Sequence, residues 1–136
     1  MLKEIYIKEL IPNNFYINEL KLNNIRKAYN MNSQSSLPPI LIGIIGEEYA
    51  LLDGHSRTMG AFEQGLETII AEVYPIEEIE GPTDLYIAIH HKAKEMGLNS
   101  IESLKKRIVT NEDHKKLWTG YCDNLMVELD KENSIF

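Results

Sequence analysis

The sequence contains a single cysteine, Cys122, among its 136 residues. One cysteine cannot form a disulfide within the chain, and such a composition is typical of proteins in a reducing compartment. No apolar run approaches the roughly 20 residues that a membrane-spanning helix needs. The first residues, Met1 to Ile7, lack the basic segment and long apolar core of a signal peptide. We therefore expect a cytoplasmic protein without a membrane segment.

Positive charge is also scarce. The chain has 14 lysines and arginines against 21 aspartates and glutamates, so its formal net charge is −7. Binding along a nucleic-acid backbone requires a basic face, and the short run Lys105-Lys106-Arg107 does not provide one. Nucleic-acid binding by the isolated chain is therefore not expected. A small charged ligand such as a nucleotide is still allowed, because one arginine and one helix terminus act locally.

The apolar periodicity predicts a small α+β domain followed by a helical tail. Hydrophobic residues make up 43% of the chain, which is enough for one core, and the sequence has no internal repeat. Residues 1–76 are predicted as strand, helix, hairpin, helix and strand. The expected bounds are 3–10 for the first strand, 18–29 for a helix capped by Asn18, 40–52 for the hairpin, 57–65 for the second helix and 68–74 for the last strand.

Residues 77–136 are predicted to form a helical C-terminal extension. One helix starts near Gly81 and stops at Gly97, a second spans Ser100 to Ile108, and a third follows a capping pattern at Thr110. Residues 133–136 are expected to fray. The apolar face of the third helix is Leu117, Trp118, Tyr121, Cys122, Leu125, Met126 and Leu129. This face either packs on its own domain or forms a homodimer seam.

The remaining reactive side chains do not predict a catalytic or metal site. His90 and His91 are adjacent, so on a helix they point about 100° apart and cannot hold one metal together. We expect them on the surface or half-buried. Cys122 lies in an apolar stripe, where a cysteine behaves as a small hydrophobic residue.

A predicted junction between strand and helix, residues 53–58, has the residue types of an anion site. A strand that runs directly into a helix leaves the first main-chain N–H groups of the helix without intrahelical partners. Gly54 lets the main chain approach a ligand, and Ser56 and Thr58 offer hydroxyl groups. Arg57 offers a planar fork that matches phosphate oxygens. The junction therefore predicts phosphate binding.

An ordinary structural interpretation applies to the same residues. Asp53 could cap the helix, Gly54 could serve a turn, and Arg57 could form a surface salt bridge. The residue types alone do not separate the two interpretations. The crowding of a cation, two hydroxyls, a histidine and a glycine into five positions favours the ligand site.

Residues 3–76 resemble the superfamily of ParB N-terminal domains and sulfiredoxin. The resemblance is carried by the hairpin 39–52, the junction with the helix after it, and the strand 69–73. Members hold nucleotide phosphates on a Gly-x-x-Arg loop, which here is Gly54-His55-Ser56-Arg57. The resemblance implies a small mixed-sheet domain that binds a nucleotide.

Single residues separate the activities within this superfamily. Sulfiredoxins carry a cysteine directly after the glycine, where this chain has His55, so sulfinic-acid repair lacks its nucleophile. Free serine kinases have an Asp-Gly-His-x-Arg loop, which would make Asp53 the general base or the carboxylate that assists a metal. They also use a glutamate soon after the first strand; here Asn13 and Asn14 occupy that region, and Glu19 is the nearest carboxylate. Partition proteins use CTP and add a helix-turn-helix DNA-reading domain, for which the remainder is short and not basic.

The predicted function is binding of a nucleotide, either ATP, ADP or CTP, with Mg²⁺. Residues Gly54 to Thr58 are the predicted phosphate loop, Asp53 and Glu19 are the candidate catalytic carboxylates, and no metal site of the protein itself is predicted. One form of this function is a small-molecule kinase acting on a hydroxylated substrate, or a nucleoside triphosphatase. The alternative is a non-catalytic regulatory or partner-interaction module related to partition proteins.

Overall fold

A computed structural model describes residues 1–134 of the chain. It is a mixed α+β structure, which confirms the predicted fold class. The strands are β1 (Leu2–Tyr6), β2 (Leu10–Pro12), β3 (Ile17–Asn18), β4 (Ile40–Ile45), β5 (Glu48–Asp53), β6 (Thr68–Pro75) and β7 (Ile108–Val109). The α-helices are α1 (Glu19–Asn30), α2 (His55–Glu63), α3 (Thr83–Glu95), α4 (Asn111–His114) and α5 (Gly120–Ser134).

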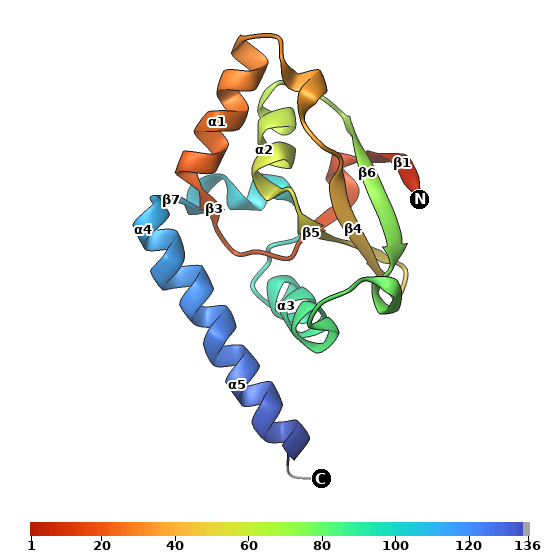
Figure 1. Ribbon diagram of the computed structural model, residues 1–136, viewed down its shortest axis with the longest axis vertical. Helices are drawn as coiled ribbons and strands as arrows, with labels where there is room; N and C mark the ends of the chain where they lie inside the picture. Colours follow the sequence, from red (N-terminus) through yellow and green to blue (C-terminus); the bar gives the residue numbers. More distant parts are fainter. Residues whose placement is uncertain (135–136) are drawn as a thin grey trace.

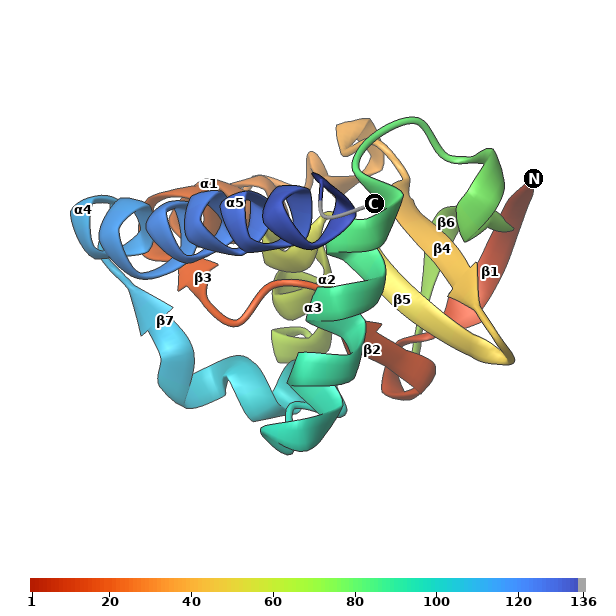
Figure 2. The same cartoon turned by 90° about the horizontal axis from the view of Figure 1, so that it is seen from below.

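Five strands form the main sheet in the order β1-β6-β4-β5-β2. β4 pairs antiparallel with β5 and parallel with β6, so it occupies the centre of the sheet. Ile40 and Ile42 of β4 are fully buried, as β-branched residues in a central strand usually are. In both overall views, helices α1, α2, α3 and α5 lie to one side of this sheet (Figure 1, Figure 2).

The predicted first strand, 3–10, is two strands at opposite edges of the sheet. β1 pairs antiparallel with β6, whereas β2 pairs parallel with β5. A 3₁₀ turn, Ile7–Glu9, carries the chain from one edge to the other. The prediction of one continuous strand was therefore wrong. Ile5, Ile7 and Leu10 are all buried although they lie on three different segments, so an apolar pattern does not reveal the change of edge.

Helices α1 and α2 pack closely against each other. A Cβ atom placed on Gly60 would lie 2.4 Å from Cγ2 of Ile25, so the small residue sets the separation of the two helices. On the surface, Arg26 Nε and Nη2 donate to the two carboxylate oxygens of Glu63 at 2.9 and 2.6 Å. The predicted cap of α1 is confirmed, because Asn18 Oδ1 accepts the N–H groups of Leu20 and Lys21.

The segment after α3 differs from the prediction. Residues Ile101–Arg107 form a 3₁₀ helix, and Ile108 belongs to strand β7, which pairs parallel with β3. The prediction of a second α-helix that includes Ile108 was therefore wrong, because the segment is a 3₁₀ helix that ends at Arg107. The strand signal is only two residues long, which is too short for apolar periodicity to reveal.

The last helix is held to the domain by aromatic contacts. Thr110 Oγ1 accepts the N–H of Asp113, which confirms the predicted cap, and a π-helical turn, Lys115–Thr119, separates α4 from α5. Phe15 contacts the rings of Trp118 and Tyr121 at centroid distances of 4.8 and 5.3 Å. Leu117, predicted on the packed face, is instead 45% exposed. Of the residues expected to fray, 133 and 134 end α5, and 135–136 lie outside the described residues.

One hydrophobic core runs through both predicted halves of the chain. Buried residues of the C-terminal half join those of the sheet. They are Leu85, Ile89, Ala93, Leu98, Ile101 and Leu104. The division into residues 1–76 and 77–136 stays a prediction about folding units. None of the helices in the described part of the chain combines the length and apolar character needed to cross a bilayer.

The pair His90-His91 shows a further departure from the sequence prediction. His90 is completely buried, and its Nε2 lies 3.1 Å from Oε1 of Glu48, which also accepts a hydrogen bond from Lys94 at 2.7 Å. Burial lowers the pKa of His90, although Glu48 opposes the shift. The sequence missed this partner because Glu48 lies on β5, far from α3 in the chain.

The contact between Phe15 and Trp118 predicts an asymmetric effect of two neighbouring substitutions. Trp118→Ala should lower the free energy of unfolding by about 2 kcal/mol, less than for a fully buried aromatic residue because Trp118 is half-buried. Leu117→Ala, its exposed neighbour, should change it by about 0.5 kcal/mol or less. Urea unfolding followed by far-ultraviolet circular dichroism measures both. Equal losses would show that Trp118 does not anchor the helix.

Candidate functional site

The junction of β5 and α2 depends on Gly54. This residue has φ 102° and ψ 30°, in the left-handed region that other residues rarely adopt. A Cβ atom at this position would lie 2.5 Å from Cγ2 of Ile40. Gly54 therefore permits both the sharp turn and the close approach of the start of α2 to the central strand β4.

The start of α2 presents main-chain donors. Gly54 is the N-cap residue and has no side chain that could cap the helix. The N–H of Thr58 donates to the Gly54 carbonyl oxygen at 2.9 Å, which begins the helical ladder. By helix geometry, the N–H groups of residues 55–57 precede that ladder and have no intrahelical acceptor. They supply positive partial charge at the end of β5.

His55 is a buried, neutral residue at the start of α2. Its Nε2 accepts a hydrogen bond from the main-chain N–H of Asn13 at 3.1 Å. Because Nε2 is an acceptor, the proton of the neutral ring is on Nδ1. Burial lowers the pKa of His55 to about 3, and the nearby Asp53 opposes the shift without reversing it. The ring therefore stays uncharged in the neutral pH range.

Asn13 ties three elements together beside this histidine. Its N–H also lies 3.0 Å from the Leu51 carbonyl oxygen on β5, and its Nδ2 donates to the carbonyl oxygen of Tyr86 on α3 at 2.9 Å. The residue is 6% exposed. Asn13 thus links β5, α2 and α3. It is one of the two asparagines in the region where free serine kinases have a glutamate.

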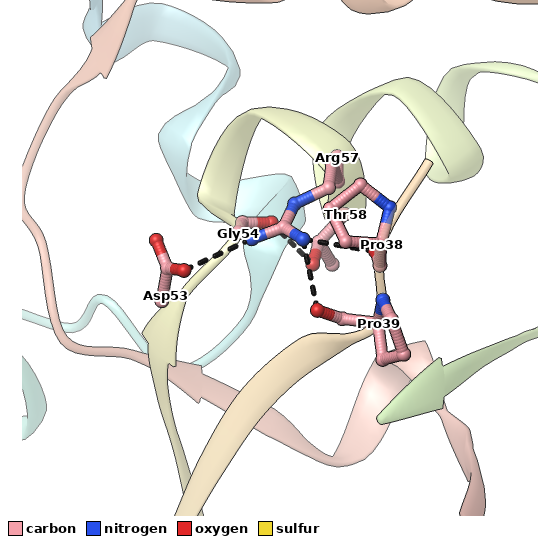
Figure 3. A network of polar contacts seen from close by, with 6 residues as sticks. All are labelled: Pro38, Pro39, Asp53, Gly54, Arg57 and Thr58. Atoms are coloured by element: carbon pink, nitrogen blue, oxygen red, sulfur yellow. Dashed lines mark hydrogen bonds and ion pairs between the residues drawn. The ribbon is translucent and has the colours of Figure 1, made fainter. Parts of the chain in front are cut away.

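Arg57 bonds to the end of β5 and to the segment directly before β4 (Figure 3). Its Nη1 donates to the carbonyl oxygens of Pro38 and Pro39 at 2.9 and 2.8 Å, and its Nη2 donates to Oδ2 of Asp53 at 3.1 Å. The Arg57 side chain is 14% exposed, whereas that of Asp53 is 75% exposed. A guanidinium has five N–H donors, and these three bonds leave Nε–H and one N–H of Nη2 for a further acceptor.

A cavity of about 430 Å³ opens at this junction. Residues 53–57 form one side, and β3, α1 and α4 complete it. Among the described residues that line it, Lys21 and Arg57 are cations, His55 and His114 are histidines, and Asp53 carries the single carboxylate. Other lining residues are Asn14, Tyr16, Asn18, Asn24, Leu37 and Pro38. The cavity is thus locally cationic in a chain of net charge −7.

The structure brings some of the predicted site residues together at the cavity and leaves others away from it. Asp53, Gly54, His55, Ser56 and Arg57 line the cavity together. The sequence prediction also included Thr58 and Glu19, which do not line the cavity.

Thr58 is fully buried, and its hydroxyl donates to the Gly54 carbonyl oxygen at 2.8 Å. Glu19 is the first residue of α1, is exposed, and is not among the residues lining the cavity. Its charge instead acts on Arg26, whose pKa is raised chiefly by the hydrogen bond to Glu63.

Sequence reasoning missed Lys21 and His114. Lys21 lies in the first turn of α1, and His114 is the last residue of α4. Their approach to the junction depends on the β3–β7 pair and on a 2.8 Å hydrogen bond from Asn18 Nδ2 to Asn111 Oδ1. The Thr110 cap signalled the helix that carries His114 but not where that helix lies. No cluster of three or more acidic, histidine or cysteine side chains suited to a metal occurs among residues 1–134.

Comparison with known proteins shows similarity at the level of fold. No protein-family model and no curated protein matches the sequence. Protein Atu1540 from Agrobacterium tumefaciens has a similar structure, with 13% sequence identity and a TM-score of 0.54 over 76% of this chain and 61% of Atu1540. This chain therefore spans less than two thirds of Atu1540.

Two further solved structures are similar. A sulfiredoxin from Arabidopsis thaliana matches with 16% identity and a TM-score of 0.45, over 55% of this chain and 85% of that protein. A conserved hypothetical protein from Pyrococcus furiosus matches with 21% identity and a TM-score of 0.48, over 59% of this chain and 34% of that protein. Atu1540 has a ParB-like fold, and the likeness to it shows that this chain shares the fold that the sequence resemblance implied.

The buried state of His55 predicts a specific loss of stability in acid. The folded pKa is about 3 and the usual value is 6.5, so between these values the unfolded chain binds the extra proton. This contribution is complete above pH 6.5 and is lost as the pH falls. Between pH 7.5 and 5 the loss should be about 2 kcal/mol, at about 1.4 kcal/mol per pH unit below 6.5.

Comparing urea unfolding of wild type, His55→Gln and His91→Gln at both pH values isolates this effect. The loss on going to pH 5 should be smaller by about 2 kcal/mol in His55→Gln, and His91→Gln controls for the removal of an exposed histidine. The same pH dependence in all three proteins would contradict a neutral, buried His55.

Proposed function

We propose that the cavity at the junction binds the phosphate groups of a nucleotide. The observation that carries the proposal is the convergence of the start of α2 with Lys21 and Arg57 on a cavity that contains one carboxylate. An anion is favoured there because two permanent cations and the partial charge of the helix terminus outweigh Asp53. The volume lies in the range of roughly 300 to 1,000 Å³ for small-molecule sites.

Main-chain N–H groups of residues 55–57, the Ser56 hydroxyl and Arg57 are the proposed phosphate ligands. The donors that Arg57 leaves after bonding the loop and Asp53 supply a directed hydrogen bond to a phosphate oxygen. Gly54 permits the turn that brings these N–H groups to the cavity. The sequence resemblance to nucleotide-binding Gly-x-x-Arg loops supports the same assignment.

The proposed cofactor is Mg²⁺ carried by ATP, ADP or CTP. Mg²⁺ is commonly held by one or two carboxylates together with substrate phosphates and water. Asp53, largely exposed at the cavity, fits that role as the one protein carboxylate. Mg²⁺ would neutralise phosphate charge, while Asp53 would orient it or accept a proton from a small hydroxylated substrate.

A non-catalytic module is the second candidate, and a specific contact favours it. Asp53 is already paired with Arg57, and Glu19, the other candidate carboxylate, does not line the cavity. This leaves one carboxylate, held by a loop contact, for all acid–base and metal chemistry. Nucleotide binding that regulates a partner needs only the cationic loop.

Replacing Arg57 should separate binding from folding. Arg57→Ala should weaken nucleotide binding by about 1.5 to 3 kcal/mol, because a charge-assisted hydrogen bond is lost. Arg57→Lys should retain part of the affinity, since it keeps the charge but loses the planar fork. Arg26→Ala, which removes a half-buried arginine outside the cavity, is the matched control. Calorimetry with ATP, ADP and CTP and thermal melting on the same samples measure both properties. Normal binding by Arg57→Ala protein with a much lower melting temperature would make Arg57 structural.

Replacing Asp53 should distinguish the two candidate functions. In an enzyme, Asp53→Asn should abolish turnover and leave most of the ground-state affinity. In a module, the same change should leave binding intact or slightly tighter, because a negative charge near phosphate is removed. The measurement is nucleotide affinity and product formation with a panel of hydroxylated metabolites, with and without Mg²⁺. Wild-type protein that binds and never turns over supports the module, and turnover that survives in Asp53→Asn rejects the catalytic role of Asp53.

A further inference from the structure

We infer that Lys21 and His114 form a second anion subsite in the same cavity, which holds a further phosphate of a polyphosphate ligand and takes up a proton when that ligand binds. This inference rests on the proposed function, because it assumes that the first phosphate occupies the start of α2. It adds a part of the chain, helix α4, to which neither the sequence resemblance nor the phosphate loop assigns a role.

The position of the two side chains is built into the fold. β3 pairs with β7, and Asn18 Nδ2 donates to Asn111 Oδ1 at 2.8 Å, so the starts of α1 and α4 are fixed to each other. Arg107 Nε also donates to the Phe15 carbonyl oxygen at 2.7 Å, and its guanidinium lies 4.5 Å from the Tyr16 ring centroid. These contacts hold Lys21 and His114 on the cavity wall formed by α1 and α4.

The π-helical turn after His114 is a second structural sign. It spans Lys115–Thr119 and begins at the residue directly after His114. π turns are rare, and they are frequent at functional sites because they change where neighbouring side chains point. Here the turn lies between the residue that faces the cavity and Trp118, which packs against Phe15. One turn of the helix therefore places His114 at the cavity, and the next places Trp118 against Phe15.

Charge explains why this subsite would select an anion and couple it to a proton. His114 lies within electrostatic reach of Lys21 on α1 and of the neutral His55 on α2, and Asp53 and Arg57 line the same cavity. Burial and the charge of Lys21 lower the pKa of His114, while the Tyr16 main chain opposes the shift. Without ligand the imidazole is therefore neutral at pH 7. A phosphate beside it would raise the pKa, so the ring would become charged as the ligand binds.

The ligand class that fits both subsites is a polyphosphate, such as a nucleoside di- or triphosphate. One phosphate would meet the residues 55–57 and Arg57, and a neighbouring phosphate would meet Lys21 and His114. Affinity would then rise with the number of phosphates. The affinity would also depend on pH. It would rise as the pH falls below the pKa that His114 has in the complex, and it would level off below the pKa that His114 has without ligand.

The test uses inorganic orthophosphate and tripolyphosphate with wild type, Arg57→Ala, His114→Gln and Lys21→Gln. His91→Gln and Lys27→Gln, both exposed positions that do not line the cavity, are the matched controls. Calorimetry at pH 7.5 and pH 6 gives the affinities. Because titration of the ligand itself is common to all proteins, the difference between variants isolates the contribution of His114.

We expect tripolyphosphate to bind wild type more tightly than orthophosphate. On lowering the pH, its affinity should gain up to about tenfold more in wild type than in His114→Gln, because the ligand raises the pKa of His114 and only the wild type takes up a proton there. Lys21→Gln should weaken tripolyphosphate binding and move its pH dependence towards higher pH, because Lys21 no longer lowers the pKa of His114. Nuclear magnetic resonance titration of the His114 ring in wild type, with and without tripolyphosphate, gives the pKa change directly and does not need the variant to fold.

The outcomes separate the two proposals. Binding that depends on Arg57 but has the same affinity and pH dependence in wild type and His114→Gln overturns the second subsite and leaves the phosphate loop standing. An unchanged pKa of His114 on saturation with tripolyphosphate does the same. Absence of binding by every phosphate compound overturns the proposed function and the second subsite together.

Discussion

The left-handed turn at Gly54 is the constraint on which the site depends. It ends β5 and starts α2 against the central strand, with Ile40 so close that no side chain fits at residue 54. The first N–H groups of α2 are therefore delivered to the end of the sheet. Arg57 follows in the first helical turn and bonds the carbonyl oxygens of Pro38 and Pro39, the residues directly before β4. The position of α2 against β4 and the placement of the Arg57 charge both follow from this one turn.

Polar contacts between distant segments then close the cavity around that turn. Asn13 joins His55 to α3, and Asn18 joins the start of α1 to α4. In both cases a short amide side chain or a main-chain N–H makes the link, so the connections are directional and fix the geometry. The aromatic contact of Phe15 with Trp118 adds apolar burial beside these bonds. Together they place a wall of α1 and α4 opposite a loop that would otherwise be open to solvent.

The sequence predicted elements with strong local signals and missed those set by distant partners. Asn18 and Thr110 were recognised as caps because capping depends on residues within one turn. The hairpin of β4 and β5 was recognised from β-branched residues around a Gly46 turn. The split between β1 and β2, and the pairing of β3 with β7, depend on residues far along the chain, so periodicity gave no sign of them. For the same reason the junction residues were found, whereas Lys21 and His114 were not.

The span of these contacts along the chain has a consequence for biogenesis. The bond between Arg107 and the Phe15 carbonyl oxygen closes a loop of 92 positions, and β3 meets β7 across a similar interval. Contacts of such long range carry a large loop-closure cost and tend to form late in folding. The junction itself is local, and its hairpin and helix can form while the rest of the chain is being synthesised. The complete cavity can exist only after helix α4 has left the ribosome and docked, so ligand affinity would report that the whole domain has assembled.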